Sequence, residues 1–159
     1  MEQAITDLVT RLGTALTKRH WLLATAESCT GGLVACRLTD VSGSSAWYVG
    51  GVVAYANHIK EKILDVPGDV LSQHGAVSEE TVLAMAAGAA RRFSAQCSLA
   101  ISGVAGPLGG SPEKPVGTVW IGWSVDGHAS AERFFFQGDR ISVKDQSAKA
   151  ALEGLLARL

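Results

Sequence analysis

Two apolar stretches near the end of the chain, Val116 to Val125 and Ala129 to Phe136, flank the dipeptide Asp126-Gly127. This dipeptide suits the positive backbone angles of a tight hairpin, so the stretches are predicted to be antiparallel strands. Earlier in the chain, short apolar runs alternate with segments of helical periodicity, which is typical of parallel strands joined by helices. Together these patterns predict a three-layer α/β/α sandwich with a mixed sheet, in a single domain that covers residues 1–159.

The remaining elements follow from apolar spacing and from the residues that begin and end helices. Ser78 is a good N-cap, because Glu79 and Glu80 follow it in the first turn of a helix. We expect helices over about residues 3–18, 33–38, 60–66 and 79–94 and at the C-terminus, and strands over about residues 22–26, 47–56 and 97–102.

Composition excludes several classes of partner. Fourteen basic and fifteen acidic residues give a formal net charge of −1, so nucleic acid and anionic membranes are not expected partners. No apolar run reaches the ~20 residues that span a bilayer, and the N-terminus lacks the pattern of a secretory signal. The three cysteines form no CxxC pair, which argues against a structural zinc site. The sequence therefore predicts a cytoplasmic protein without a metal or other cofactor.

Ser28 lies in the segment AESCTGG, at a predicted turn between a strand and a helix. Such a turn exposes a serine hydroxyl near the positive end of the helix, where a base can activate it as a nucleophile. The backbone N–H groups near Gly31 and Gly32 can bind a phosphate or a developing oxyanion. The alternative is that Ser28 or Thr30 only caps the helix.

Lys60 is a candidate base, because burial or a neighbouring cation can lower the pKa of a lysine toward neutrality. Its spacing from Ser28 does not show that the two meet, and a solvated lysine on a helix is the alternative. Tyr55 is either a site residue or a strand aromatic whose hydroxyl is bonded elsewhere.

Residues 102–117 hold five glycines and three prolines, which prevents regular structure. Long irregular loops in compact domains are functional or disordered, and the glycine N–H groups here can form an anion-binding nest. Arg140 can bind a phosphate or pair with a carboxylate. The SxxK pattern from Ser111 to Lys114 is a coincidence of the loop, because prolines oppose the helix that the motif needs. Cys29 is a weaker rival of Ser28, since none of the four histidines lies in a recognisable partner motif.

Several segments occur in the order of a known family and cover about residues 25–140. They are AESCTGG at 26–32, GSSAWYVGGVVAYANHIK at 43–60, HGAVSEE at 74–80, SGVAGPLGG at 102–110, KPVGTVWIG at 114–122 and GDR at 138–140. The chain thereby resembles the C-terminal domain of the CinA (competence/damage-inducible) family, whose stand-alone members are nicotinamide-nucleotide amidases.

The resemblance implies hydrolysis of the carboxamide of nicotinamide mononucleotide to nicotinate mononucleotide and ammonia. It places the nucleophile on Ser28, the base on Lys60 and a catalytic tyrosine on Tyr55. It also implies a substrate site that includes Ser102, Gly103, Gly106 and Arg140, together with Thr30 and Gly31 of the ESCTGG motif, and it favours a homodimer or larger homo-oligomer.

The chain departs from the family pattern at two positions, with Ala56 in place of a serine and Asp65 in place of a glycine. Full-length members carry a further N-terminal domain linked to ADP-ribose pyrophosphatase activity, for which this chain has no room, so that activity is expected to be absent. The rival hypotheses are a catalytically silent pyridine-nucleotide-binding or regulatory protein and an amidase for a different small amide.

Overall fold

Five strands form one mixed sheet in the computed structural model of the chain, which describes residues 2–159. The strands are β1 (Leu23–Glu27), β2 (Tyr48–Val53), β3 (Cys97–Gly103), β4 (Thr118–Val125) and β5 (His128–Phe135). Their order across the sheet is β2-β1-β3-β4-β5. Strands β2, β1 and β3 run parallel to one another, and β4 and β5 continue the sheet with antiparallel pairing.

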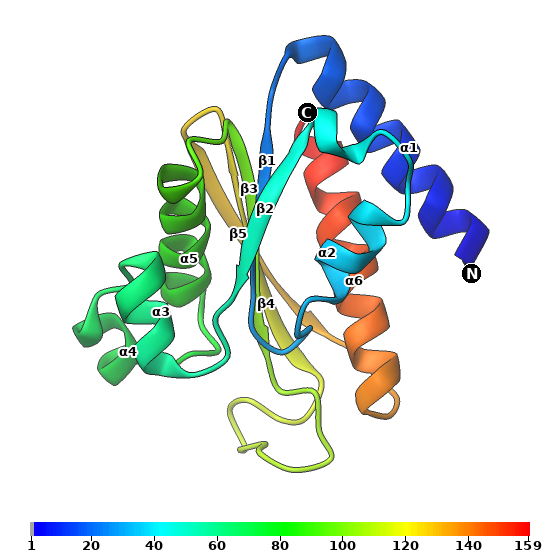
Figure 1. The fold of residues 1–159 in the computed structure, drawn as a ribbon. Helices are drawn as coiled ribbons and strands as arrows, with labels where there is room; N and C mark the ends of the chain where they lie inside the picture. Colours follow the sequence, from blue (N-terminus) through cyan, green and yellow to red (C-terminus); the bar gives the residue numbers. More distant parts are fainter. Residues whose placement is uncertain (1) are drawn as a thin grey trace.

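Two helical layers cover the sheet, as Figure 1 shows. The helices are α1 (Glu2–Arg19), α2 (Leu33–Thr39), α3 (Asn57–Leu64), α4 (Gly68–His74), α5 (Glu79–Arg92) and α6 (Arg140–Arg158), with a short 3-10 helix at Ser44–Ala46. One layer consists of α1, α2 and α6, and the other of α3, α4 and α5. The predicted three-layer α/β/α sandwich with a mixed sheet is confirmed.

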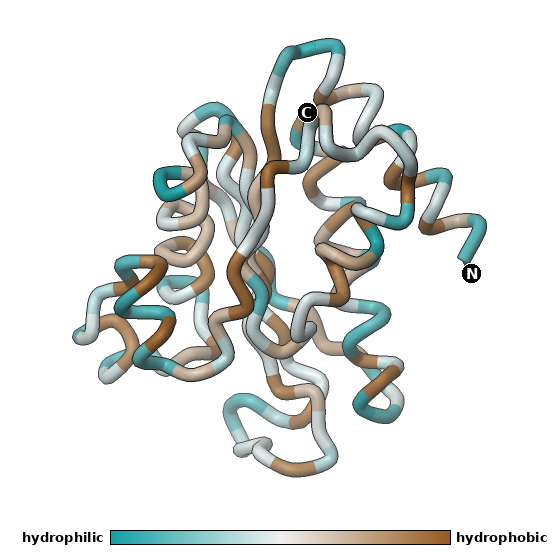
Figure 2. The backbone as a smooth tube through the Cα atoms, viewed as in Figure 1, coloured by the Kyte–Doolittle hydropathy of each residue, from teal (hydrophilic) through white to brown (hydrophobic). Residues whose placement is uncertain are grey.

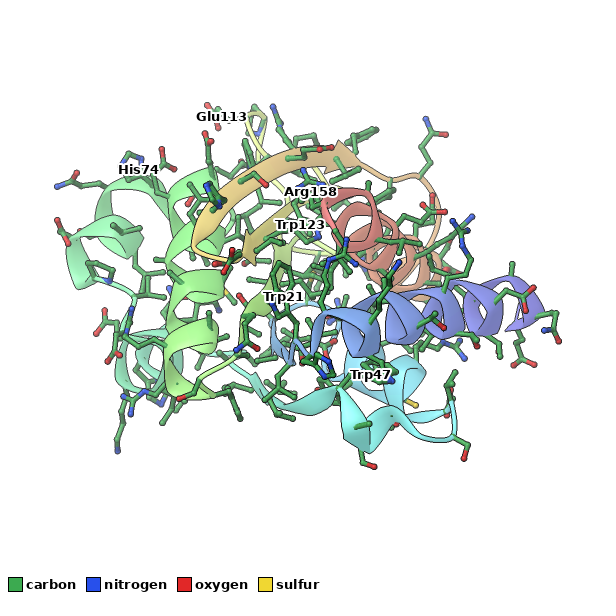
Figure 3. The ribbon with its side chains drawn as sticks, turned by 90° about the horizontal axis from the view of Figure 1, so that it is seen from above. Trp21, Trp47, His74, Glu113, Trp123 and Arg158 are labelled. Atoms are coloured by element: carbon green, nitrogen blue, oxygen red, sulfur yellow. The ribbon has the colours of Figure 1, made fainter. Side chains whose placement is uncertain are left out.

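Each layer encloses its own hydrophobic cluster, since side chains of successive strand residues point to opposite faces of the sheet. In Figure 2 the strands carry hydrophobic residues, whereas the turn after α1 is hydrophilic. Trp123 of β4 is fully buried, and its indole N–H donates to the Ala151 carbonyl at 2.9 Å. The guanidinium of Arg158 lies 3.8 Å from the centre of the Trp123 ring, a cation–π contact that joins α6 to the sheet (Figure 3).

The local signals in the sequence were accurate at several element boundaries. Ser78 caps α5 by accepting the Thr81 N–H at 3.2 Å. Asp126 and Gly127 both have positive φ angles, of 49° and 81°, at the turn of the β4–β5 hairpin. The helix α4 was not predicted, although Pro67 at its start, Asp69 in its first turn and Gly75 after its end are ordinary helix signals.

The strand order explains where a site can form. The chain leaves β1 through α2 on one face to reach β2, and it returns through α3, α4 and α5 on the other face to reach β3. The connections therefore diverge at the carboxyl ends of β1 and β3. In open α/β sheets, ligands bind in the crevice outside such a switch point.

Candidate active site

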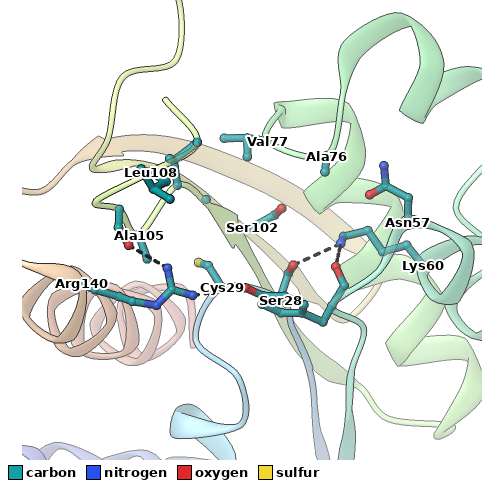
Figure 4. A pocket seen from close by; sticks show the side chains of 15 residues that line it. Ser28, Cys29, Asn57, Lys60, Ala76, Val77, Ser102, Ala105, Leu108 and Arg140 are labelled. Atoms are coloured by element: carbon teal, nitrogen blue, oxygen red, sulfur yellow. Dashed lines mark hydrogen bonds between the residues drawn. The ribbon is translucent and has the colours of Figure 1, made fainter. Parts of the chain in front are cut away.

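Ser28 and Lys60 meet at this switch point, although 32 positions separate them in the sequence. Ser28 follows β1 directly, and Lys60 lies on α3, just after β2. Lys60 Nζ lies 3.1 Å from Ser28 Oγ and donates a second hydrogen bond to the Tyr55 carbonyl at 3.0 Å. Figure 4 shows both contacts inside the pocket. The serine and the lysine are thus within the distance that proton transfer requires.

Burial changes the chemistry of Lys60. Its side chain is only 1% exposed, which is rare for a lysine. Desolvation disfavours the ammonium form and lowers the pKa of Lys60 below the ordinary 10.5. The structure contradicts the alternative of a solvated helix lysine. A neutral amine at this position can accept the proton of the Ser28 hydroxyl.

The turn from Ser28 to Gly32 is held tightly in place. The Ser28 N–H donates to the Ile101 carbonyl of β3 at 2.9 Å, and the Gly31 N–H donates to the Ser28 carbonyl at 3.1 Å. Gly31 and Gly32 have φ angles of 62° and 101°, in the left-handed region that favours glycine. The two glycines therefore allow the backbone to turn sharply from β1 into α2.

The N–H groups of Ser28, Gly31 and Gly32 already donate to acceptors within the protein. Fewer N–H groups of this turn can therefore bind an oxyanion than the sequence suggested. The N–H of Gly32 donates to the Glu27 side chain, and that of Gly31 donates to the backbone. Within residues 2–159, the N–H groups of Cys29 and Thr30 donate to no backbone carbonyl. These two groups remain as candidate oxyanion donors.

A pocket of about 270 Å³ opens beside Ser28 and Lys60. Arg140, the first residue of α6, reaches into it and joins two of its walls. Its guanidinium donates to the Gly106 carbonyl at 2.7 Å and to the Tyr55 hydroxyl at 3.2 Å. The pocket thus has a cation on the wall opposite Lys60, as Figure 4 shows.

The structure brings most of the sequence-predicted site residues together at this pocket. The residues that line it include Ser28, Tyr55, Lys60, Ser102, Gly103, Gly106 and Arg140. Thr30 and Gly31 are not among the lining residues. The Thr30 hydroxyl points to the other side of the turn and donates to Glu27 Oε1 at 2.7 Å.

Eight further residues line the pocket without having been assigned to it from the sequence, among them Cys29, Asn57, Val77 and Leu108. Asn57 precedes Lys60 by three positions on α3, so the two occupy the same helix face. The segment GSSAWYVGGVVAYANHIK, in which Asn57 stands between Tyr55 and Lys60, already contained that signal. Residues 104–117 form the loop between β3 and β4. Leu108 of this loop is 85% exposed, and no pattern in the sequence indicated that it lies at the pocket.

Cys29 is a poor alternative nucleophile. It lies next to Ser28 and is buried, and desolvation raises the pKa of its thiol to about 11. The reactive form of a cysteine is the thiolate, which is scarce at neutral pH when the pKa is raised in this way. Ser28 therefore remains the stronger candidate.

Residues 2–159 contain neither a metal-binding cluster nor a membrane-spanning helix. No three His, Cys, Asp or Glu side chains in that range gather as metal ligands. None of the helices formed by those residues combines the length and the hydrophobicity needed to cross a membrane.

The fold and the site define an α/β sandwich protein with a buried serine–lysine pair at its switch point. The model of the CinA C-terminal domain family matches residues 5–159. The chain therefore belongs to the CinA C-terminal domain family.

Curated relatives fall into two length classes. The nicotinamide-nucleotide amidohydrolase PncC of Pseudomonas putida is 51% identical over 152 residues, which are 96% of this chain and 95% of that protein. The protein of the same name from Escherichia coli K12 is 45% identical over 155 residues, with 97% and 94% coverage. A CinA-like protein of Gemmatimonas aurantiaca is 45% identical over 94% of this chain, which spans only 35% of that longer protein.

Solved structures agree with the fold. The competence damage-inducible protein A from Klebsiella pneumoniae superposes with a TM-score of 0.94 at 37% identity and covers 97% of this chain and 96% of its own. The competence/damage inducible protein CihA from Agrobacterium tumefaciens gives a TM-score of 0.93 at 40% identity, with 96% and 94% coverage.

Proposed function

We propose that the chain is a nicotinamide-nucleotide amidohydrolase, which converts nicotinamide mononucleotide to nicotinate mononucleotide and ammonia. The observation that carries the proposal is the contact of 3.1 Å between Ser28 Oγ and the buried Lys60 Nζ inside the pocket. The names of the Pseudomonas putida and Escherichia coli relatives, which match this chain over nearly their full lengths, support the same activity.

In the proposed mechanism, neutral Lys60 takes the Ser28 proton as the hydroxyl oxygen attacks the carboxamide carbon. The N–H groups of Cys29 and Thr30 stabilise the oxyanion of the tetrahedral intermediate. The Lys60 ammonium then protonates the departing nitrogen, and ammonia leaves an acyl ester on Ser28. Water activated by Lys60 hydrolyses the ester and restores the free serine.

Arg140 is proposed to bind the phosphate of the nucleotide. Its guanidinium carries the positive charge on the wall opposite Lys60, and a planar guanidinium suits phosphate oxygens. Tyr55 is proposed to orient the site, because its hydroxyl accepts from Arg140 while its carbonyl accepts from Lys60. Ser102, Gly103 and Gly106 line the same pocket, and the substrate is proposed to lie along them.

The direct test is ammonia release from nicotinamide mononucleotide by the purified protein without added metal, beside a Ser28→Ala variant. We expect release by the wild type and only background by the variant. A folded wild type that binds the nucleotide without releasing ammonia would instead support the silent binding protein. The expected homo-oligomer and the cytoplasmic location stay predictions.

A further inference from the structure

Glu27, the last residue of β1, lies directly before Ser28 and is only 1% exposed. Its carboxylate accepts four hydrogen bonds. The donors are the Thr30 hydroxyl at 2.7 Å and the N–H groups of Gly32 at 3.2 Å, Val34 at 2.9 Å and Ala35 at 3.0 Å. In each of these contacts the side-chain oxygen of Glu27 accepts from an N–H or O–H donor.

These contacts place the carboxylate at the N-terminus of α2. The first N–H groups of a helix have no partner within the helix, and an internal anion satisfies them and the helix dipole together. The main chain of Glu27 is fixed as well, because its carbonyl accepts the Ala54 N–H at 2.8 Å. Glu27 therefore joins the end of β1 to the start of α2 across the turn that it precedes.

The position of Ser28 depends on that closed turn. The chain from Glu27 to Val34 runs around the carboxylate. Ser28 is the first residue after Glu27, and its Oγ points toward Lys60. Glu27 itself lies on the other face of the sheet, since side chains alternate along a strand. It does not line the pocket, and its influence on the reaction must pass through the backbone of residues 28–32.

We propose that Glu27 is a positioning residue for the nucleophile, which rests on the amidase function proposed above. Its carboxylate holds the 28–32 turn so that Ser28 Oγ stays in contact with Lys60.

The test is the steady-state kinetics of Glu27→Gln. The amide keeps the size of the side chain, but its NH₂ group opposes one of the four N–H or O–H donors. We expect kcat to fall by about 100-fold, because a small displacement of a reacting group has effects of that order. KM should stay within about threefold, since the residues proposed to bind the nucleotide lie on other elements. A rise in KM with an unchanged kcat, or no change in either constant, would overturn the proposal.

Two variants separate positioning from general destabilisation. Thr30→Val removes one donor to the carboxylate and should lower kcat about tenfold, also without raising KM. Ser98 lies in the neighbouring strand β3, and Ser98→Ala removes its buried hydrogen bond to the Ala86 carbonyl of α5, away from the pocket. It should lower the melting temperature and leave kcat unchanged. Equal loss of kcat in Ser98→Ala would mean that Glu27 acts only through stability.

The inference and the proposed function can fail separately. A wild type without amidase activity refutes the function, and the rate at which a sulfonyl fluoride labels Ser28 then tests Glu27 without any substrate. Slower labelling of Ser28 in Glu27→Gln than in Ser98→Ala, measured by peptide mass spectrometry, is the expected result. Equal labelling rates would overturn the inference. An active wild type with a fully active Glu27→Gln variant refutes the inference alone.

Discussion

The 28–32 turn and the 104–117 loop face each other across the pocket and differ in how they are held. In the turn, Ser28 and Thr30 are buried, at 7% and 1% exposure, and the backbone is hydrogen-bonded to β3 and to Glu27. The loop carries Leu108 at 85% exposure, and long side chains from other elements reach out to its carbonyls. Reacting groups need fixed geometry, whereas a surface that admits a substrate can stay open. We infer that the turn serves the chemical step and that the loop serves binding.

The largest effect is expected at Lys60. Lys60→Met keeps an unbranched apolar side chain of similar length in the buried site but removes the base. We expect kcat for ammonia release to fall about 10³-fold or more, within the range that general acid–base catalysis contributes. The melting temperature should hold or rise, because a buried amine is removed. A Lys60→Met protein with unimpaired turnover would refute the role given to the lysine.

Substitution of Arg140, which donates to the loop carbonyl of Gly106, tests whether this wall of the pocket binds the substrate. Arg140→Ala should raise KM for nicotinamide mononucleotide by about 10-fold to 100-fold, since a charge-assisted hydrogen bond contributes roughly 1.5–3 kcal/mol. The fall in kcat should be the smaller effect. Arg140→Lys is the matched control, because it keeps the charge and loses the planar fork. A change in kcat alone would place Arg140 with the chemical step.

The pH dependence of kcat tests the state of Lys60. Only the neutral amine can accept the serine proton, so kcat should rise with pH, by up to about tenfold per unit, and then level off. Burial lowers the pKa of Lys60, so the midpoint should fall below 10.5. Stopped assays over a pH range, with the far-UV circular dichroism spectrum recorded at each pH, measure this. A rate that falls as pH rises through this range would contradict the assignment.

The smallest effect is expected within the loop. The Lys114 ammonium donates to the His74 carbonyl at 2.7 Å and so ties the loop to the end of α4. Lys114→Ala should raise KM by no more than about threefold and leave kcat unchanged, because exposed charged contacts contribute little. Steady-state kinetics beside the wild type measure both constants. A large fall in kcat would show that the loop takes part in the chemical step.

The sequence predicted the fold well because its signals are local. Apolar periodicity, the Ser78 cap and the Asp126-Gly127 turn each depend on neighbouring residues, and each is confirmed. Asp65, which departs from the family pattern, adopts a φ of 56° after α3, and its carboxylate accepts hydrogen bonds from Arg91 and Arg92. An aspartate tolerates this left-handed position better than most residues do, and the two arginines pair with it.

The site was harder to predict, because its contacts join distant parts of the chain. Spacing could not show that Lys60 reaches Ser28, since the folding of β2 beside β1 creates that contact. Only the resemblance to a family suggested the pair. Thr30 was predicted to bind substrate, but its hydroxyl turns to Glu27, which sequence reasoning had not singled out. The sequence did contain a signal for this contact, because Glu27 stands three positions before Thr30 at the start of a turn with two glycines.

Ser28 is proposed as the nucleophile that becomes acylated, and every step of the mechanism depends on it. Acid quenching of the wild type during turnover of nicotinamide mononucleotide, followed by peptide mass spectrometry, tests this directly. We predict a nicotinate-nucleotide ester on Ser28 in the quenched wild type. An acyl group on Cys29, or turnover by Ser28→Ala at the wild-type rate, would contradict it.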